Sequence, residues 1–431
     1  MNPTLNTSQR TIIRAVDSSK SYAERICSEL VRTNTVNPYA GGPAGNETDG
    51  QLILQRELKG LGFTTELFEC PPNIYKRTGI LGPTHRSHAG RMNLVAQRTL
   101  RQPGKTVVIN GHMDTVGITD MTIAPFSGTL KNGRIMGRGA CDCKGGLTGG
   151  LVAVKALVET GVLDRGAIIF ESVIDEECSG CGAGTIACCL AGHGGDFCIM
   201  LDGTADSITV ECLGVVTGKI SVTGQGGHAV ERQAISALDM ACLVKEELDR
   251  VKARRLAGHR QTSFCIGQFS AGTAPWTIPS DAHMAFNMSY PIDEARKAEK
   301  TRGAFNGILA REMVEQALAR ARQSHPWLRA HPPKIEWIKD MIPYQTDRRH
   351  PLTQAVAKAY RQTTRKKARI TVESGWSDAT WAARLGRMPT VAFGTARPGA
   401  AHAPDEWVAV ADILTQAKVV ALAVTDLTAA E

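Results

Sequence analysis

The chain has few aromatic residues and no apolar run long enough to cross a membrane. Phe, Trp and Tyr make up 5% of its 431 residues. No apolar stretch approaches the roughly 18–20 residues that span a bilayer. The first residues, MNPTLNTSQRTIIRAVDSSKS, are polar and lack the apolar segment of a secretory signal. These absences predict a soluble, cytoplasmic protein whose 12 cysteines are reduced thiols.

Charge of one sign is not concentrated anywhere along the chain. The 50 Lys and Arg residues against 42 Asp and Glu give a net charge of +8. This mild excess lacks the basic stripe of a nucleic-acid binder. The phosphate-loop pattern GxxxxGK[ST] is absent as well. We therefore expect no nucleic-acid partner, no membrane partner and no phosphate loop.

The hydrophobic pattern divides the chain into three segments. Short apolar runs bounded by Gly and Asp, with helices between them, predict buried strands of a doubly wound, mixed α/β sheet. These runs are GKTVVING, GAIIFESVID and GDFCIMLDG. From Glu211 to Asp340 the order strand, helix, strand, strand, helix, strand predicts an inserted α+β two-layer sandwich. The expected α/β domain therefore has two segments, 1–210 and 341–431, and the insertion is 211–340.

Acidic and imidazole side chains lie at the ends of the predicted strands and in Gly-rich loops. The carboxyl ends of parallel strands border the crevice in which α/β proteins bind ligands. Three consecutive carboxylates, as in Asp175-Glu176-Glu177, repel one another unless cations lie among them. The candidate site residues are His112, Asp114, Asp142, Glu176, Glu177, Asp202 and His402.

These residue types indicate metal-assisted hydrolysis. Carboxylate and imidazole ligands suit Zn, Mn or Co ions. Asp142, Glu177 and Asp202 together supply three negative charges, and two divalent ions with one hydroxide would balance them. Taken singly, each residue has another interpretation, such as a buried histidine at His112 beside a helix-capping Asp114. Together they favour a site for two metal ions.

Seven motifs follow one another across nearly the whole chain: RTNTVNP, HMDTV, GRGACDCKGG, DEECSG, GGHA, GTAPWTIP and AHAPDEW. In order and spacing they resemble the co-catalytic zinc amidohydrolases and peptidases. That family includes acetylornithine deacetylase, succinyl-diaminopimelate desuccinylase, aminoacylase and glutamate carboxypeptidase. The resemblance implies that His112 and Asp202 hold one metal ion and that Glu177 and His402 hold the other. Asp142 would bridge both ions, with a cis peptide bond between it and the next residue.

The resemblance also implies a reaction and an assembly. A metal-bridging hydroxide would cleave the amide C–N bond of a carboxylate-bearing N-acyl amino acid or short peptide, with Glu176 as the general base. Asp114 would orient His112. The insertion would be a lid and dimerisation domain, from which His228 reaches the active site of a partner subunit in a homodimer.

Some positions depart from the pattern of these relatives. Asp202-Gly203-Thr204 stands where relatives have Glu-Pro-Thr, and Trp276 stands where many have a substrate-contacting Asn. The segment MAFNMSYP lacks the arginine that often binds the substrate carboxylate. Trp376 lies in a loop that is rich in Gly, Thr and Ser in relatives. The two tryptophans indicate either a flat, aromatic substrate or ordinary core packing or a dimer seam.

These departures leave alternatives open. Ser374, Ser377 and Arg397 are candidates to bind a substrate carboxylate in place of the absent arginine. A second hypothesis is an aminohydrolase that removes the amino group of an aromatic acid, as the nitroanthranilate-hydrolysing relative does. A third is a non-catalytic binding protein, although the presence of Glu176 and of all five ligand positions disfavours it.

The cysteines permit further interpretations. Cys178 and Cys181 form a CxxC, which is half of a zinc knuckle, but no second CxxC occurs. Cys141 and Cys143 flank Asp142, where they are either buried, inert thiols or redox-sensitive groups or soft ligands.

Overall fold

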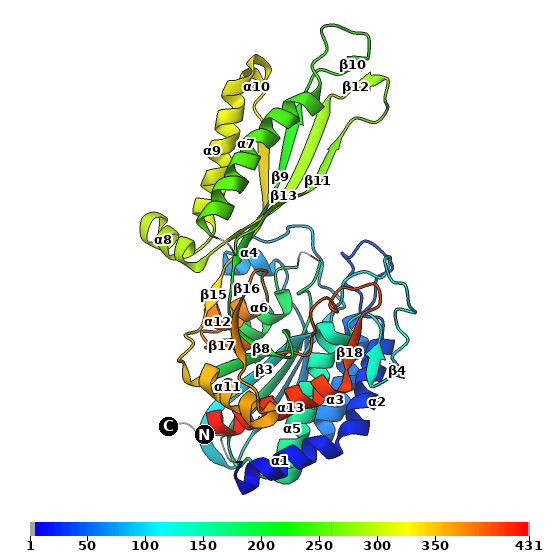
Figure 1. Cartoon of the computed structure of the whole chain (residues 1–431), viewed down its shortest axis with the longest axis vertical. Coiled ribbons are helices and arrows are strands. Elements are labelled where there is room, and N and C mark those ends of the chain that lie inside the picture. Colours follow the sequence, from blue (N-terminus) through cyan, green and yellow to red (C-terminus); the bar gives the residue numbers. More distant parts are fainter. Residues whose placement is uncertain (1–4, 179, 260, 430–431) are drawn as a thin grey trace.

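A nine-stranded mixed sheet organises the larger part of the molecule, the lower part in Figure 1. The computed structural model describes residues 5–178, 180–259 and 261–429. The strand order is β1-β2-β6-β3-β7-β17-β8-β15, with β16 beside β8, and the central pairs β6–β3, β3–β7 and β7–β17 are parallel. The strands are β1 (Thr64–Glu69), β2 (Met92–Thr99), β3 (Gln102–His112), β6 (Arg165–Val173), β7 (Phe197–Met200), β8 (Ser207–Cys212), β15 (Tyr344–Gln345), β16 (Arg369–Glu373) and β17 (Thr390–Ala392).

Helices cover both faces of this sheet, so its central strands are buried on both sides. On β3, Val107 and Ile109 pack into one core while Val108 packs into another. This explains why the strand is apolar throughout instead of alternating. The first face carries α1 (Thr7–Ser18), α2 (Lys20–Arg32), α3 (Glu47–Gly60), α5 (Gly145–Thr160), α11 (Pro351–Thr364) and α13 (Val410–Thr428). The second face carries α4 (Ile74–Thr78), α6 (Ala183–Leu190) and α12 (Ala379–Arg384).

The structure confirms the expected mixed α/β sheet. The antiparallel edge pair β1–β2 and the strand β16 were not predicted. A small sheet of β4 (Thr129–Lys131), β5 (Arg134–Met136) and β18 (Trp407–Ala409) connects the segments that precede Asp142 and follow His402. A turn, Ala140–Lys144, in which Asp142 and Cys143 have non-helical backbone angles, leads into α5. No helix in the described part of the chain is both long and apolar enough to cross a membrane.

A second, antiparallel sheet forms the upper part of the molecule in Figure 1, with its own hydrophobic core. We call residues 214–341, from the first residue of β9 to the last of β14, the inserted sandwich. Its strand order is β11-β13-β9-β14. The strands are β9 (Gly214–Thr223), β11 (Phe264–Ala271), β13 (Asp281–Tyr290) and β14 (Lys334–Met341), and a short pair at the far tip is β10 (Gly227–His228) with β12 (Thr277–Ile278).

Helices pack on one face of this second sheet. On β13, Ala282, Met284, Phe286 and Met288 are buried, whereas the residues between them are less buried, so the strand has the period-two pattern of a sheet covered on one face. The helices are α7 (Ala237–Gly258), α8 (Ile292–Arg302), α9 (Ile308–Ser324) and α10 (Pro326–Ala330). Two of them, α8 and α10, are additional to the predicted order of elements.

Candidate metal centre

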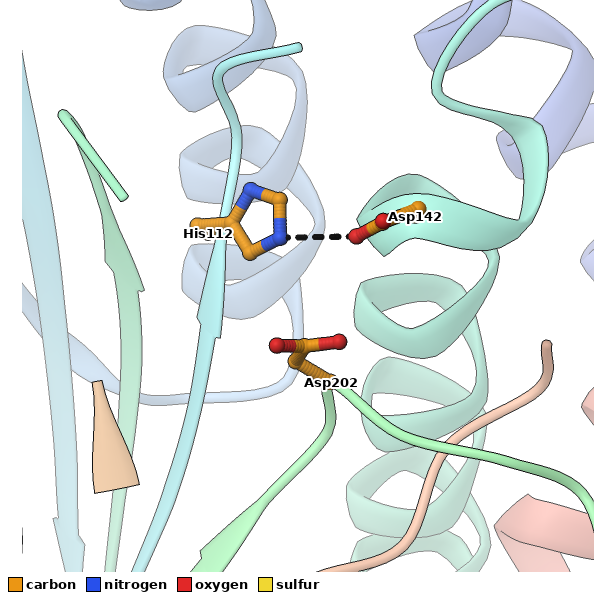
Figure 2. Close-up of side chains that lie close together, drawn as sticks. All are labelled: His112, Asp142 and Asp202. Carbon is orange, nitrogen blue, oxygen red and sulfur yellow. Dashed lines mark hydrogen bonds and ion pairs between the residues drawn. The ribbon is translucent and has the colours of Figure 1, made fainter. Parts of the chain in front are cut away.

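The candidate site lies where neighbouring strands of the large sheet end. His112 is the last residue of β3, and Asp202 lies just beyond the end of β7. Because β3 lies between β6 and β7, the segments that follow these three strands meet at one edge of the sheet. Glu176 and Glu177 follow β6 there. Figure 2 shows His112 and Asp202 facing Asp142, which lies in the turn that leads into α5.

The carboxylate of Asp142 lies between two imidazoles. Its Oδ1 is 3.0 Å from Nε2 of His112, and its Oδ2 is 3.2 Å from Nε2 of His402. Nε2 of His402 is also 2.9 Å from Oε1 of Glu177. The peptide bond between Asp142 and Cys143 is cis, which confirms that expectation.

Three overlapping sets of side chains have potential ligand atoms within 4.8 Å of one another. The first is His112, Asp142 and Asp202, and the second is Asp142, Glu177 and His402. Asp142 belongs to both. The third set adds Glu176, beside His112 and Glu177. The structure thus brings together all five side chains expected as ligands and the expected base.

Burial makes three of these carboxyls difficult to ionise, whereas hydrogen bonds to His112 and His402 lower the pKa of Asp142 despite its burial. Burial and the nearby charge of Asp142 raise the pKa of Glu177 to about 7 and that of Asp202 to about 6. Burial raises the pKa of Glu176 well above its ordinary value. A carboxyl that leaves water ionises readily only beside a compensating positive charge.

The imidazoles respond in the opposite direction. Burial opposes the protonation of His112, but the hydrogen bond to Asp142 and the negative charges around the ring together outweigh burial and raise its pKa. Hydrogen bonds to Asp142 and Glu177 raise the pKa of His402 to about 11. The cluster brings four carboxyls and two imidazoles together, and its nearest oxygen and nitrogen donors lie 2.9–3.2 Å apart. Divalent ions bind such donors at about 2.0–2.2 Å, so the residues fit a metal centre.

Asp114 contributes to the site differently from the expectation. Nδ1 of His112 lies 2.9 Å from the backbone oxygen of Asp114, whereas its carboxylate Oδ1 is 3.7 Å away. The carboxylate instead accepts hydrogen bonds from the backbone N–H groups of Glu176 (3.2 Å) and Glu177 (3.0 Å) and from Nδ2 of Asn37 (2.8 Å). The side chain of Asp114 thus holds the loop that carries the two glutamates.

A buried ion pair that was not predicted from the sequence supports Asp142. Oε1 of Glu406 accepts hydrogen bonds from the backbone N–H groups of Cys141 (3.1 Å) and Asp142 (3.3 Å). Its Oε2 accepts a 2.9 Å hydrogen bond from Arg138. Glu406 lies in the motif AHAPDEW with His402, and Arg138 lies in GRGACDCKGG. The sequence therefore shows both residues, but it does not show that they form a pair.

Two of the candidate substrate residues have partners outside the metal centre. Arg397 makes hydrogen bonds of 2.8 and 2.6 Å to Asp412. Nε1 of Trp376 donates to the backbone oxygen of Ile342 at 3.2 Å, and its ring packs edge-on against Trp381 at 5.9 Å. Trp376 is therefore half-buried and packs against the core cluster that contains Trp381.

The remaining candidates are more exposed. Ser374 is exposed in the loop before α12, and Ser377 is half-buried there. His228 is exposed at the tip of the inserted sandwich, in β10, and Trp276 beside it is 64% exposed. Among the described residues, His228 belongs to none of the metal-ligand sets.

No cysteine belongs to the ligand sets found in the described part of the chain. Cys143 and Cys181 are fully buried, and burial raises the pKa of the Cys181 thiol to about 12. The Cys178 thiol also has its pKa raised to about 12 by burial. A buried, protonated thiol is unreactive, in agreement with the inert interpretation of Cys143. The protonated thiols of Cys178 and Cys181 do not favour a zinc knuckle.

The mixed α/β sheet and the carboxylate–imidazole cluster at its strand ends define the class: a metal-dependent hydrolase that acts on C–N amide bonds. Residues 108–426 match the model of Peptidase family M20/M25/M40, and the chain belongs to this family.

Known relatives cover nearly the whole chain. It is 26% identical over 419 residues to the N-formyl-4-amino-5-aminomethyl-2-methylpyrimidine deformylase of Halalkalibacterium halodurans, with 90% of this chain and 91% of that one covered. It is 27% identical over 418 residues to a succinyl-diaminopimelate desuccinylase of Bradyrhizobium sp., with 91% and 96% covered. The structure of the di-peptidase Dug1p from Saccharomyces cerevisiae has a TM-score of 0.74 at 15% identity, over 99% of this chain and 100% of that one, and shows the same fold.

Proposed function

We propose that this protein hydrolyses the amide bond of an N-acyl amino acid or a short peptide, as a deacylase or carboxypeptidase, with two divalent metal ions. Zinc is the first candidate, and Mn and Co are the others. His112 and Asp202 would hold one ion, Glu177 and His402 the other, and Asp142 both. The observation that carries the proposal is the position of Asp142, which faces His112 with one carboxylate oxygen and His402 with the other.

The chain's own residues supply proton transfer and positioning. Divalent ions bound at this site would polarise the scissile carbonyl and lower the pKa of a water molecule. Glu176 would accept a proton from the attacking water and deliver it to the leaving nitrogen. Burial raises its pKa, which makes its carboxylate a stronger proton acceptor. The hydrogen bond from its backbone N–H to Asp114 keeps it beside the centre.

We also propose the domain division 1–210, 211–340 and 341–431, in which the two outer segments form the catalytic domain. The inserted domain would act as a lid and as the interface of a homodimer. The separate core of the inserted sandwich supports this division. The exposure of His228 at the far tip supports a role for this histidine in the active site of the partner subunit.

A second candidate is the removal of an amino group from an aromatic acid. Because Trp376 packs against a core cluster, Trp276 is the tryptophan that better supports a flat substrate. The named substrate of the deformylase relative contains a pyrimidine ring, so a flat N-acyl compound belongs among the substrates to be tested.

The test is a substrate panel for the protein loaded with Zn, Mn or Co. N-acyl amino acids, dipeptides, an N-formyl aminomethylpyrimidine and aminobenzoates are incubated, and the products are identified. We expect a free acid and a free amine. Release of ammonia alone would support the second candidate instead. Less than about one ion per chain, with no turnover of any compound, would support a non-catalytic binding protein.

A further inference from the structure

The loop that carries Glu176 and Glu177 has an unusual backbone on both sides of the pair. Asp175, just before them, has φ of 67°, and Cys178, just after them, has φ of 57°. Residues other than glycine seldom adopt this left-handed conformation, because the β-carbon crowds the backbone. Such a conformation persists where surrounding contacts hold it. A residue that contacts both Asp175 and Cys178 would hold both sides of the pair.

Arg86 contacts both flanking residues at once. Its Nη1 donates to Oδ1 of Asp175 at 2.5 Å, and its Nη2 donates to the backbone oxygen of Cys178. The planar guanidinium group has donors in a fixed fork, which suits two acceptors at defined positions. Arg86 comes from the loop between α4 and β2, far from Glu176 in the sequence.

The Arg86 side chain is itself fixed in place. It is only 6% exposed, and its guanidinium lies 4.3 Å from the centre of the Tyr39 ring. The phenol oxygen of Tyr39 accepts a 2.5 Å hydrogen bond from the backbone N–H of Ser87. Packing and hydrogen bonds thus fix the orientation of Arg86.

Asp175 has other partners, and one of them, Asn37, also donates a long 3.5 Å hydrogen bond to the backbone oxygen of Glu177. The Asp175 carboxylate also accepts hydrogen bonds from Tyr75 (3.1 Å), His88 (2.9 Å), Arg91 (3.2 Å) and Asn37 (3.2 Å). Among these described donors to Asp175, only Arg86 also bonds to Cys178. The loss of Arg86 would therefore remove the hydrogen bond to Cys178 and loosen the segment after Glu177, which backbone hydrogen bonds from Gly180 and Gly182 also hold, while Asp175 keeps four side-chain partners.

We infer that Arg86 is a positioning residue that fixes the Glu176–Glu177 pair by joining the residues on either side of it. The inference rests on the proposed roles of the two glutamates. Arg86 does not touch the substrate or the metal ions, and it acts through the backbone of residues 175–178. Lysine at position 86 would keep the charge, but a single ammonium group would not reproduce the fork.

The first test measures the loop without any metal or substrate. Amide hydrogen exchange is compared for the wild-type protein, Arg86→Lys and the control Arg98→Lys. Arg98 is a half-buried arginine that also donates to a backbone oxygen, that of Leu61. We expect about tenfold faster exchange in peptides covering residues 175–182 of Arg86→Lys only, because opening of a segment follows its local stability. If Arg86→Lys exchanged at the wild-type rate in this segment, or if its exchange were accelerated equally throughout the chain, the inference would be overturned.

The second test uses zinc alone. Chelator-treated protein is titrated with Zn²⁺ by calorimetry, and we expect Arg86→Lys to weaken one of two binding events about tenfold or more. For Arg86→Ala, added guanidinium chloride at low millimolar concentration should restore that binding event. Equal weakening of both events, or no rescue, would contradict the inference. A wild-type protein that binds no zinc would refute the proposed function, while the exchange test would still decide the role of Arg86.

Discussion

The strand ends of the large sheet and the tip of the inserted sandwich hold their side chains very differently. His112 is 2% exposed, whereas Trp276 at the tip is 64% exposed. His112 has hydrogen-bonding partners at both ring nitrogens, whereas among the described residues the ring of His228 has only a long 3.5 Å contact from the backbone N–H of Val230. The chain thus keeps fixed the side chains that need defined mutual distances. It leaves exposed the tip side chains, which under the proposed function would act only when a partner subunit binds.

The largest effect should come from the fixed region. Glu176→Gln removes the proton acceptor but keeps the size and shape of the side chain. We expect turnover to fall about 10²–10⁴-fold with two ions still bound. Steady-state kinetics and metal analysis of the same preparation measure both quantities. Glu373→Gln, which changes an exposed carboxylate on β16, should remain active; an active Glu176→Gln would remove Glu176 from its proposed role.

Substitution of Trp376 and of Trp276 tests how tightly each of the two regions is packed. Trp376→Ala empties part of a packed cluster and should lower the free energy of unfolding by about 3 kcal/mol. Trp276→Ala changes an exposed side chain and should alter it by less than about 0.5 kcal/mol. Urea denaturation monitored by circular dichroism measures both values. Equal losses would mean that the tip is packed against something, such as a partner subunit.

The tip should affect catalysis without affecting metal binding. We expect His228→Ala to lower turnover about 10- to 100-fold while zinc affinity stays at the wild-type value. If His228 acts in a partner subunit, a mixture of His228→Ala and Glu176→Gln should regain activity, because mixed dimers contain one intact site. A 1:1 mixture of a two-fold dimer would recover about a quarter of wild-type activity. A mixture no more active than its components would place His228 outside the partner's site.

The smallest effect concerns a residue that only supports a ligand. Glu406→Gln should weaken zinc binding about tenfold, because Glu406 accepts hydrogen bonds from the backbone N–H groups of Cys141 and Asp142. Zinc titration measures this change. Asp405→Asn, at the exposed neighbouring position, is the matched control and should bind zinc as the wild type does. Unchanged binding in Glu406→Gln would mean that the loop holds Asp142 without this carboxylate.

Local patterns were sufficient to predict the strand ends. A strand buried on both faces is apolar throughout, so its end is visible in the sequence, and His112, Glu177 and Asp202 were found in this way. The pairs Glu406–Arg138 and Arg86–Asp175 could not be found, because each joins segments that are distant in sequence and share no periodic pattern. The packing of Trp376 depends on Ile342 and Trp381, which belong to separate elements. Local sequence therefore predicts where ligands lie, and long-range contacts decide how firmly they are held.

The position of Asp142 between His112 and His402 has a thermodynamic consequence. If one carboxylate serves both ions, as proposed, the two binding events form a single linked equilibrium. Any factor by which the first ion strengthens or weakens binding of the second must be the same when the order of binding is reversed. The protein would then respond to metal supply through the abundance of the doubly loaded form and not through two independent occupancies.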